Sequence, residues 1–184
     1  MTDNIISIQY DSDIAKGNEA VRISFYANIG FFLEVAQMFE FNLRKLICYE
    51  RSVKEIENAV LTKENVEQIC AKFNKYYDDS YNDRFTLGKL VNESKVNSSI
   101  PKDFFDFMTE LNKFRIFIVH QLFQRNIINH DFESAKFVHD YTSKRIVPMT
   151  NRAIKVNKAI INIIDLYRTD LRDYKKQVGI EIKE

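Results

Sequence analysis

Arg115 and His120, five residues apart, are the pair in this 184-residue chain whose types and spacing best suit chemistry. Both lie in the most apolar stretch of the sequence, residues 114–123. A helix turns by about 100° per residue, so their Cα positions lie roughly 140° apart and flank one helix edge. A guanidinium can hold a phosphate through two hydrogen bonds, and an imidazole exchanges a proton near neutral pH. The pair therefore suits phosphoryl chemistry, with His120 moving a proton and Arg115 holding the phosphate.

The same pair also has a structural interpretation, in which both side chains are satisfied inside the fold. Helix ends can supply the partners, and so can carboxylates elsewhere in the chain, such as Glu34, Glu40 or Glu110. The spacing is not unique either, because Arg125 and His130 repeat it. Spacing alone leaves both the interpretation and the choice of pair open.

The elements that must position these residues are helices. Four glycines and two prolines are too few for the many tight turns of a sandwich, barrel or hairpin-rich fold. A hydrophobic fraction of 45% and a charged fraction of 29% are typical of globular proteins, and 15 Phe with 9 Tyr exclude a disordered chain. We therefore predict an all-α protein, an up-and-down bundle of about six helices.

Apolar residues recur three and four positions apart over a first long stretch, which predicts a helix from Asn18, its cap, to about Tyr49. Gly30 within this helix is typical of a bend or a close helix crossing. Ser52 and Glu55 have the spacing of a capping box, so we expect a short second helix to begin there.

Further helix starts follow along the chain. Thr62 is the expected start of a helix that runs to about Tyr77, and residues 76–83, rich in tyrosine and aspartate, are predicted to form a loop. Thr86 is the expected cap of a short helix, and the polar residues 92–99 are the longest candidate linker.

The helix that carries Arg115 and His120 is expected to open at Pro101, because proline is tolerated in a first turn. Asp131 is the predicted cap of a long final helix, which Pro148 should kink or interrupt. The resulting division is a helical domain at residues 18–178, an N-terminal extension at 1–17 and a C-terminal tail at 179–184.

Location and cofactors follow from what the sequence lacks. The start has no basic and apolar regions of a secretory signal, and no window is apolar enough for a bilayer span, so we expect a cytoplasmic protein that binds no membrane. Cys48 and Cys70 suit inert core thiols, since two distant cysteines make neither a disulfide framework nor a zinc site. Without a Glu-x-x-His pair or a glycine-rich phosphate loop, we expect no metal and no cofactor.

The charge is nearly balanced overall and unbalanced locally. A formal net charge of +1 argues against a surface devoted entirely to a polyanion but permits a basic patch. Residues 141–177 hold nine basic and three acidic side chains, which is typical of an RNA-facing surface or of a solvated helix face. Glu40 and Arg44, four apart, suit either a solvated ion pair or the lining of a cleft between two protomers.

Three stretches of the chain, in order, resemble the HEPN domain (higher eukaryotes and prokaryotes nucleotide-binding), in particular its small stand-alone bacterial members. Phe39 to Ile47 is similar to the early-helix pattern E-x-x-L-R-x-L-I, and Thr86 to Val91 is similar to T-L-G-x-L-I. Leu111 to Leu122 resembles L-N-x-L-R-N-x-x-A-H-x-L and contains Arg115 and His120. The resemblance covers about residues 34–135, most of the domain.

The resemblance implies a helical bundle that forms a homodimer, in which the Arg-x4-6-His motifs of two chains make one composite site. In catalytic members this site is a metal-independent endoribonuclease, used by toxins and abortive-infection systems. Carried onto this chain, His120 is general base or acid at the RNA 2′-hydroxyl, and Arg115 holds the scissile phosphate and stabilises its developing charge. The product is a cyclic phosphate end, and DNA is spared because it lacks that hydroxyl.

The chain departs from the family pattern directly after Arg115. Members often carry a polar residue there, commonly Asn, one turn before the His, whereas this chain has Ile116, which cannot hydrogen-bond. Asn112 is a partial substitute. The second pair does have the polar residue, Asn126, but its histidine lies where the chain is expected to break before the final helix, so we prefer Arg115 and His120.

The departure leaves an alternative function, a non-catalytic HEPN-like module that binds RNA or a partner protein. A helical structural or regulatory protein without a site is a third interpretation. The sequence names neither the RNA target nor an antitoxin, such as a minimal nucleotidyltransferase, that would accompany the protein.

Overall fold

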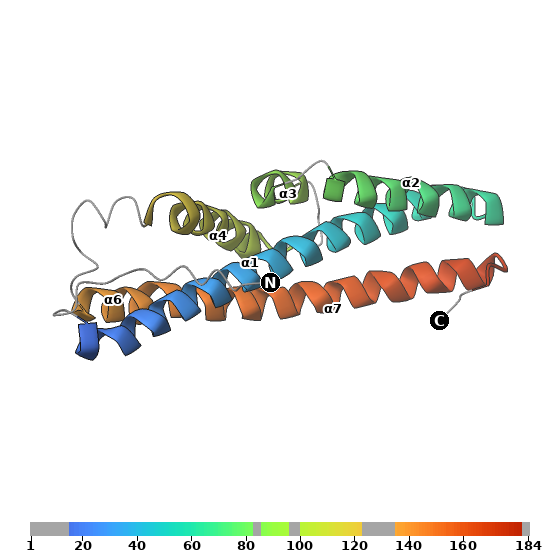
Figure 1. Ribbon diagram of the computed structural model, residues 1–184. Helices are drawn as coiled ribbons and strands as arrows, with labels where there is room; N and C mark the ends of the chain where they lie inside the picture. The colour runs from blue at the N-terminus through green and yellow to red at the C-terminus, as the bar shows by residue number, and fades with distance from the viewer. Residues whose placement is uncertain (1–14, 83–85, 96–99, 123–134, 182–184) are drawn as a thin grey trace, which may run out of the picture.

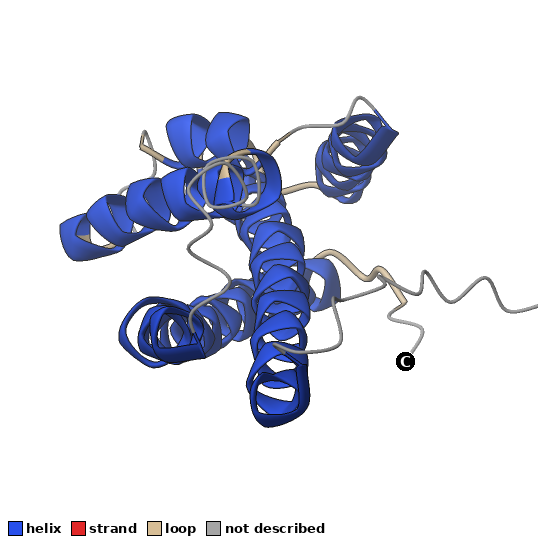
Figure 2. Ribbon diagram, turned by 60° about the vertical axis from the view of Figure 1, so that its left-hand side comes forward, coloured by secondary structure: helices blue, strands red, loops and turns tan. Residues whose placement is uncertain are grey.

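The computed structural model describes residues 15–82, 86–95, 100–122 and 135–181, and within these ranges all regular secondary structure is helical (Figures 1 and 2). The predicted all-α bundle is confirmed. The described residues form five helical rods, slightly fewer than the expected six, because the short helix expected at Ser52 is part of α1.

The spine of the fold is α1 (Ala15–Glu57), which packs along α7 (Val147–Gln177) (Figure 1). The apolar stripe predicted for this stretch forms the core, because its members fall on one helical face and are buried. Gly30 is exposed, and a Cβ built on it meets nothing within 4 Å, so none of the described helices crosses α1 closely there.

The helix break predicted at Ser52 is wrong, because α1 continues to Glu57. The Ser52 hydroxyl donates a hydrogen bond to the carbonyl of Cys48, four residues back, and does not cap a new helix. Val53 and Ile56 are buried and extend the apolar stripe. Burial of this last part of α1 therefore outweighs the local capping signal and keeps these residues in the helix.

Helix α2 (Lys63–Asn82) packs against α1 (Figure 1). Its predicted start is confirmed, since the backbone N–H of Asn65 donates to Thr62 Oγ1 at 3.2 Å. The loop predicted at 76–83 is wrong for residues 76–82, because the helix continues to Asn82, and residue 83 lies outside the described part. Contacts of Tyr76 with neighbouring helices favour this continuation of α2. The Tyr76 hydroxyl donates to Glu93, and the guanidinium of Arg51 lies over the Tyr76 ring.

Two shorter elements cover α1 on the same side (Figure 1). Helix α3 (Leu87–Ser94) is capped by Thr86, whose hydroxyl accepts from the N–H of Lys89, as predicted. The expected linker begins later than 92, because α3 ends at Ser94, and residues 96–99 lie outside the described part. Helix α4 (Lys102–His120) begins directly after Pro101.

The final helical rod consists of α6 (Ala135–Tyr141), a π-helical segment η2 (Thr142–Ile146) and α7. Pro148 explains the π segment, since its ring lacks an N–H and crowds the carbonyl four residues back. The N–H of Val147 donates to Thr142, five residues back, which widens the turn. The predicted interruption at Pro148 is thus a local widening. The predicted cap, Asp131, lies outside the described residues.

The buried apolar side chains form two clusters. The larger joins α1 to α3, α4, α6, η2 and α7, and the smaller joins the end of α1 to α2 and α7. The C-terminal end of α7 is closed by Gly179, whose φ of 72° places it in the left-handed region. Its N–H donates to Lys176, and that of Ile180 donates to Lys175. Within the described residues, no helix is long and apolar enough to cross a membrane.

Candidate functional site

Helix α4 crosses α1, and two aromatic contacts hold it there. The ring of Phe107 lies 6.0 Å from that of Phe39, and the ring of Phe114 lies 5.1 Å from that of Phe32, both edge to face. Four of the bulkiest core side chains therefore hold the motif helix against the spine. This packing positions Arg115 beside the middle of α1.

Arg115 is held by Glu40 of α1. Its Nη1 lies 3.4 Å from Oε2 of Glu40, and Nη2 of Arg44 lies 3.6 Å from the other carboxylate oxygen. Arg44 is buried, Oε2 of Glu40 is shielded from solvent, and the Arg115 side chain is 29% exposed. The predicted Glu40–Arg44 pair is confirmed, but it lies in the interior and not in solvent. Of the three carboxylates named as partners for Arg115, Glu40 is the one that binds it.

His120 is the last residue of α4 and is exposed. The helix closes after it, where the N–H of Gln121 donates to the carbonyl of Phe117 at 2.9 Å. Among the described residues, no hydrogen bond or ion pair to the imidazole is found. The structural interpretation therefore applies to Arg115 and not to His120.

One chain does not bring the two motif side chains together. Counting about 100° per residue from Arg115, Val119 follows at roughly 40°, Ile116 at 100° and His120 at 140° around α4. Ile116 and Val119 are exposed by 44% and 50%. We call these four residues the motif face. Its two ends carry the chemistry, and its middle is apolar and open to solvent.

The three stretches that carry the family resemblance lie in contact. Glu40 from the first binds Arg115 from the third. A Cβ added to Gly88, from the second, would lie 3.0 Å from Nδ2 of Asn112, from the third, so the amide packs closely on the α3 backbone. Asn112 therefore packs against α3.

A cleft of about 700 Å³ opens on the other side of His120, between α4 and the η2–α7 rod. It is lined by four cationic side chains, Lys113, Lys144, Arg145 and Arg152, with Glu110 as the acid. Phe114, Phe117 and Tyr141 supply aromatic walls. The basic excess at 141–177 pointed to three of the cations, but nothing in the sequence indicated that α4 faces them.

The remaining candidates are structural or lie elsewhere. Burial raises the pKa of the Cys48 thiol to about 12 and also raises that of Cys70, so both free thiols stay protonated near neutral pH. Cys48 is buried in the core, as expected, whereas Cys70 is only partly buried. His139 is exposed beside Asp140. The second motif, Arg125 and His130, lies outside the described residues.

Comparisons of the chain with protein-family models, curated proteins and solved structures find no match.

Proposed function

We propose that this protein is a HEPN-like endoribonuclease of toxin or defence type, which acts without a metal at a cleft between two protomers. The observation that supports it best is the motif face. It presents an exposed imidazole and a half-buried guanidinium on either side of exposed apolar side chains, an arrangement that suits burial against a second copy. A homodimer would supply two Arg115 and two His120 side chains to one site.

In the proposed reaction, a neutral His120 accepts the proton of an RNA 2′-hydroxyl, and the 2′-oxygen attacks the adjacent phosphorus. The bond from phosphorus to the 5′-oxygen breaks, and the protonated His120 of the second protomer returns a proton to that oxygen. The products are a 2′,3′-cyclic phosphate and a 5′-hydroxyl. Arg115 neutralises the charge that develops on the non-bridging oxygens.

Glu40 has a positioning role in this proposal. A guanidinium carries five N–H donors, and the contact with Glu40 engages Nη1. The carboxylate fixes the Arg115 side chain against α1, and the exposed part of the guanidinium remains for a phosphate. Arg44 on the other oxygen of Glu40 keeps that carboxylate in place.

A non-catalytic RNA-binding module is the second candidate. It is favoured by the neutralisation of Arg115 by Glu40 and by Ile116, which offers no hydrogen bond to the imidazole. The two candidates differ in one measurable respect, because only the first cleaves RNA.

The test is a cleavage assay with single-stranded RNA in EDTA, comparing the wild-type protein with His120→Ala and His139→Ala. His139 is the matched control, an exposed histidine away from α4. We expect His120→Ala to lower the cleavage rate at least 100-fold and His139→Ala to leave it unchanged. RNA with a 2′-deoxy substitution at the cleaved position should resist.

Undiminished cleavage by His120→Ala would refute the proposed reaction. A wild-type protein that binds RNA and leaves it intact would establish the non-catalytic module instead.

A further inference from the structure

We propose that the cleft between α4 and the η2–α7 rod binds single-stranded RNA and directs the strand past His120. The inference rests on the proposed function for the choice of RNA, and on the cleft itself for everything else. The basic excess at residues 141–177 left an RNA-facing surface and a solvated helix face open, and neither it nor the motif face indicated this cleft.

The charge of the cleft suits a phosphate backbone. Two of its four cations are paired within the chain: Lys144 Nζ lies 3.0 Å from Asp140, and Arg152 donates to Glu110 at 2.9 Å. For Lys113 and Arg145, no ion pair with a described residue is found. These two cations lie on opposite walls, one on α4 and one on η2, so a strand between them meets a positive charge on each side.

The aromatic walls suit bases. Phe117 of α4 and Tyr141 of α6 both line the cleft and are neighbours, with ring centroids 6.5 Å apart and planes inclined by 31°. Tyr141 also stacks on Phe137 at 5.9 Å, which fixes its ring. Cationic side chains interleaved with aromatic rings are the combination by which proteins bind single strands without reading sequence. A volume of about 700 Å³ accommodates a nucleotide.

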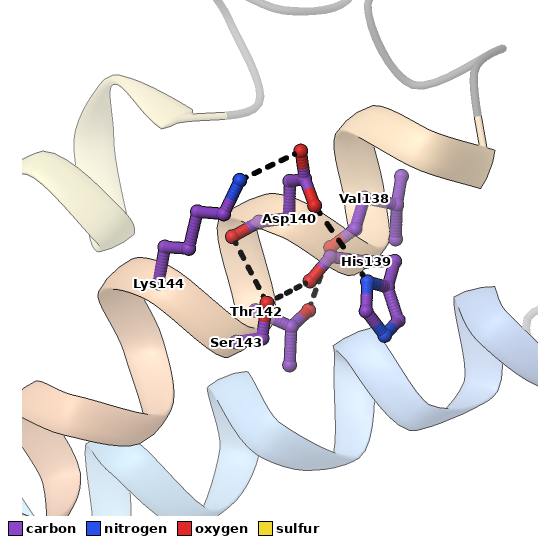
Figure 3. Close-up of polar contacts among 6 residues, drawn as sticks. All are labelled: Val138, His139, Asp140, Thr142, Ser143 and Lys144. Atoms are coloured by element: carbon purple, nitrogen blue, oxygen red, sulfur yellow. Dashed lines mark hydrogen bonds and ion pairs between the residues drawn. The ribbon is translucent and has the colours of Figure 1, made fainter.

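The π segment shapes the basic wall, as Figure 3 shows for its start. The hydroxyl of Thr142 donates to the carbonyl of Val138, and that of Ser143 donates to the carbonyl of His139. These bonds tie the junction between α6 and η2, where the hydrogen-bond spacing changes from four to five residues. The wider turn carries both Lys144 and Arg145 into the lining of the cleft.

Lys144 is steadied by Asp140, which lies between it and His139 (Figure 3). The hydrogen bond from Lys144 lowers the pKa of the Asp140 carboxyl, so the pair is charged near neutral pH. Asp140 therefore offsets the charge of Lys144, and the pair is exposed to solvent.

The cleft adjoins the motif face through His120. Around α4, Lys113 lies about 20° beyond His120, and Phe117 lies about 60° beyond it. Phe117 and His120 are also three residues apart, so their side chains are neighbours on the helix surface. A strand that stacks on Phe117 therefore passes the imidazole, and the cleft supplies the binding energy that positions the phosphate there.

The test measures binding of a labelled 2′-O-methyl oligoribonucleotide, which cannot be cleaved, by fluorescence anisotropy at several salt concentrations. The variant Lys113→Gln with Arg145→Gln should raise Kd at least tenfold. It should also lower the slope of log K against log salt by about 1.4, since each neutralised phosphate on a single strand contributes about 0.7. Phe117→Leu, which keeps an apolar side chain, should raise Kd at least fivefold through lost stacking.

The control variant is Lys63→Gln with Lys75→Gln, which removes two exposed charges on α2. It should change Kd less than twofold. Circular dichroism of each variant establishes that the helices are intact.

Equal loss in the cleft and control variants, or no loss in the cleft variant, would overturn the inference. Binding of a free nucleotide but not of the oligonucleotide would overturn it too. The outcome is independent of catalysis, because His120→Ala should bind the uncleavable strand normally. A failure of the cleavage mechanism would therefore leave the cleft assignment standing. Likewise, a failure of the cleft assignment would leave the cleavage mechanism standing.

Discussion

Glu40 of α1 forms the ion pair that joins this helix to α4. It shares its two oxygens between buried Arg44 and half-buried Arg115, so one carboxylate compensates two guanidinium groups. Removing one partner of a buried pair costs more than the pair itself contributes, because the remaining charge stays desolvated. The two arginines should therefore respond differently to loss of this carboxylate.

Glu40→Gln is expected to lower the free energy of unfolding by about 2 kcal/mol, because Arg44 stays buried with less compensation. Arg115→Gln should cost under about 1 kcal/mol, since Arg115 is partly solvated. Urea unfolding followed by circular dichroism measures both. If Arg115→Gln lowered the free energy of unfolding more than Glu40→Gln, Glu40 would compensate mainly the charge of Arg115. That result would contradict the deeper burial of Arg44.

At the scale of elements, α1 is 43 residues long and therefore reaches both apolar clusters of the bundle. Its first part packs against α4 and α6, and its last part packs against α2. A break at Ser52 would detach the second cluster from the first. Continuity of α1 thus holds both clusters in one bundle.

Two substitutions test where helices begin. Thr86→Ala should lower the free energy of unfolding by about 1 kcal/mol, because it removes the cap of α3. Ser52→Ala should change it by less than about 0.5 kcal/mol, since the hydroxyl bonds only to a carbonyl already within the helix. Chemical denaturation compares them directly. A cost for Ser52→Ala as large as that for Thr86→Ala would mean that Ser52 acts as a cap after all.

At the scale of the whole molecule, the proposed reaction needs a second copy of the chain, because Arg115 and His120 lie on opposite flanks of the motif face. Its centre is apolar and exposed, and the far side of α4 is the basic cleft. In the proposed assembly, the apolar centre is buried between protomers, and the two clefts stay open to RNA.

Replacing both Ile116 and Val119 with Asp is expected to convert the proposed dimer to a monomer, because two charges would be buried against their own copies. Light scattering coupled to size exclusion gives the mass, and cleavage should fall with it. Leu166→Asp is the control, since Leu166 is 67% exposed on α7. A wild-type monomer, or a dimer that survives the double change, would contradict an interface on this face.

The sequence by itself determined the helical class, the apolar stripe of α1, the caps at Thr62 and Thr86, and the helix that carries Arg115 and His120. These features follow from spacings of three and four residues, which are local and are readable along the chain. The same local signals failed at Ser52 and at residues 76–82. There, burial of Val53 and the contacts of Tyr76 outweigh the capping and loop patterns.

Only the tertiary structure decided the site. The choice of Glu40 among three carboxylates, the contact of Gly88 with Asn112, and the meeting of α4 with η2 across the basic cleft all join residues far apart in the chain. Such contacts depend on how helices pack and cross. The spacing of apolar residues in the sequence indicates which face of a helix is buried, but not which helix packs against that face.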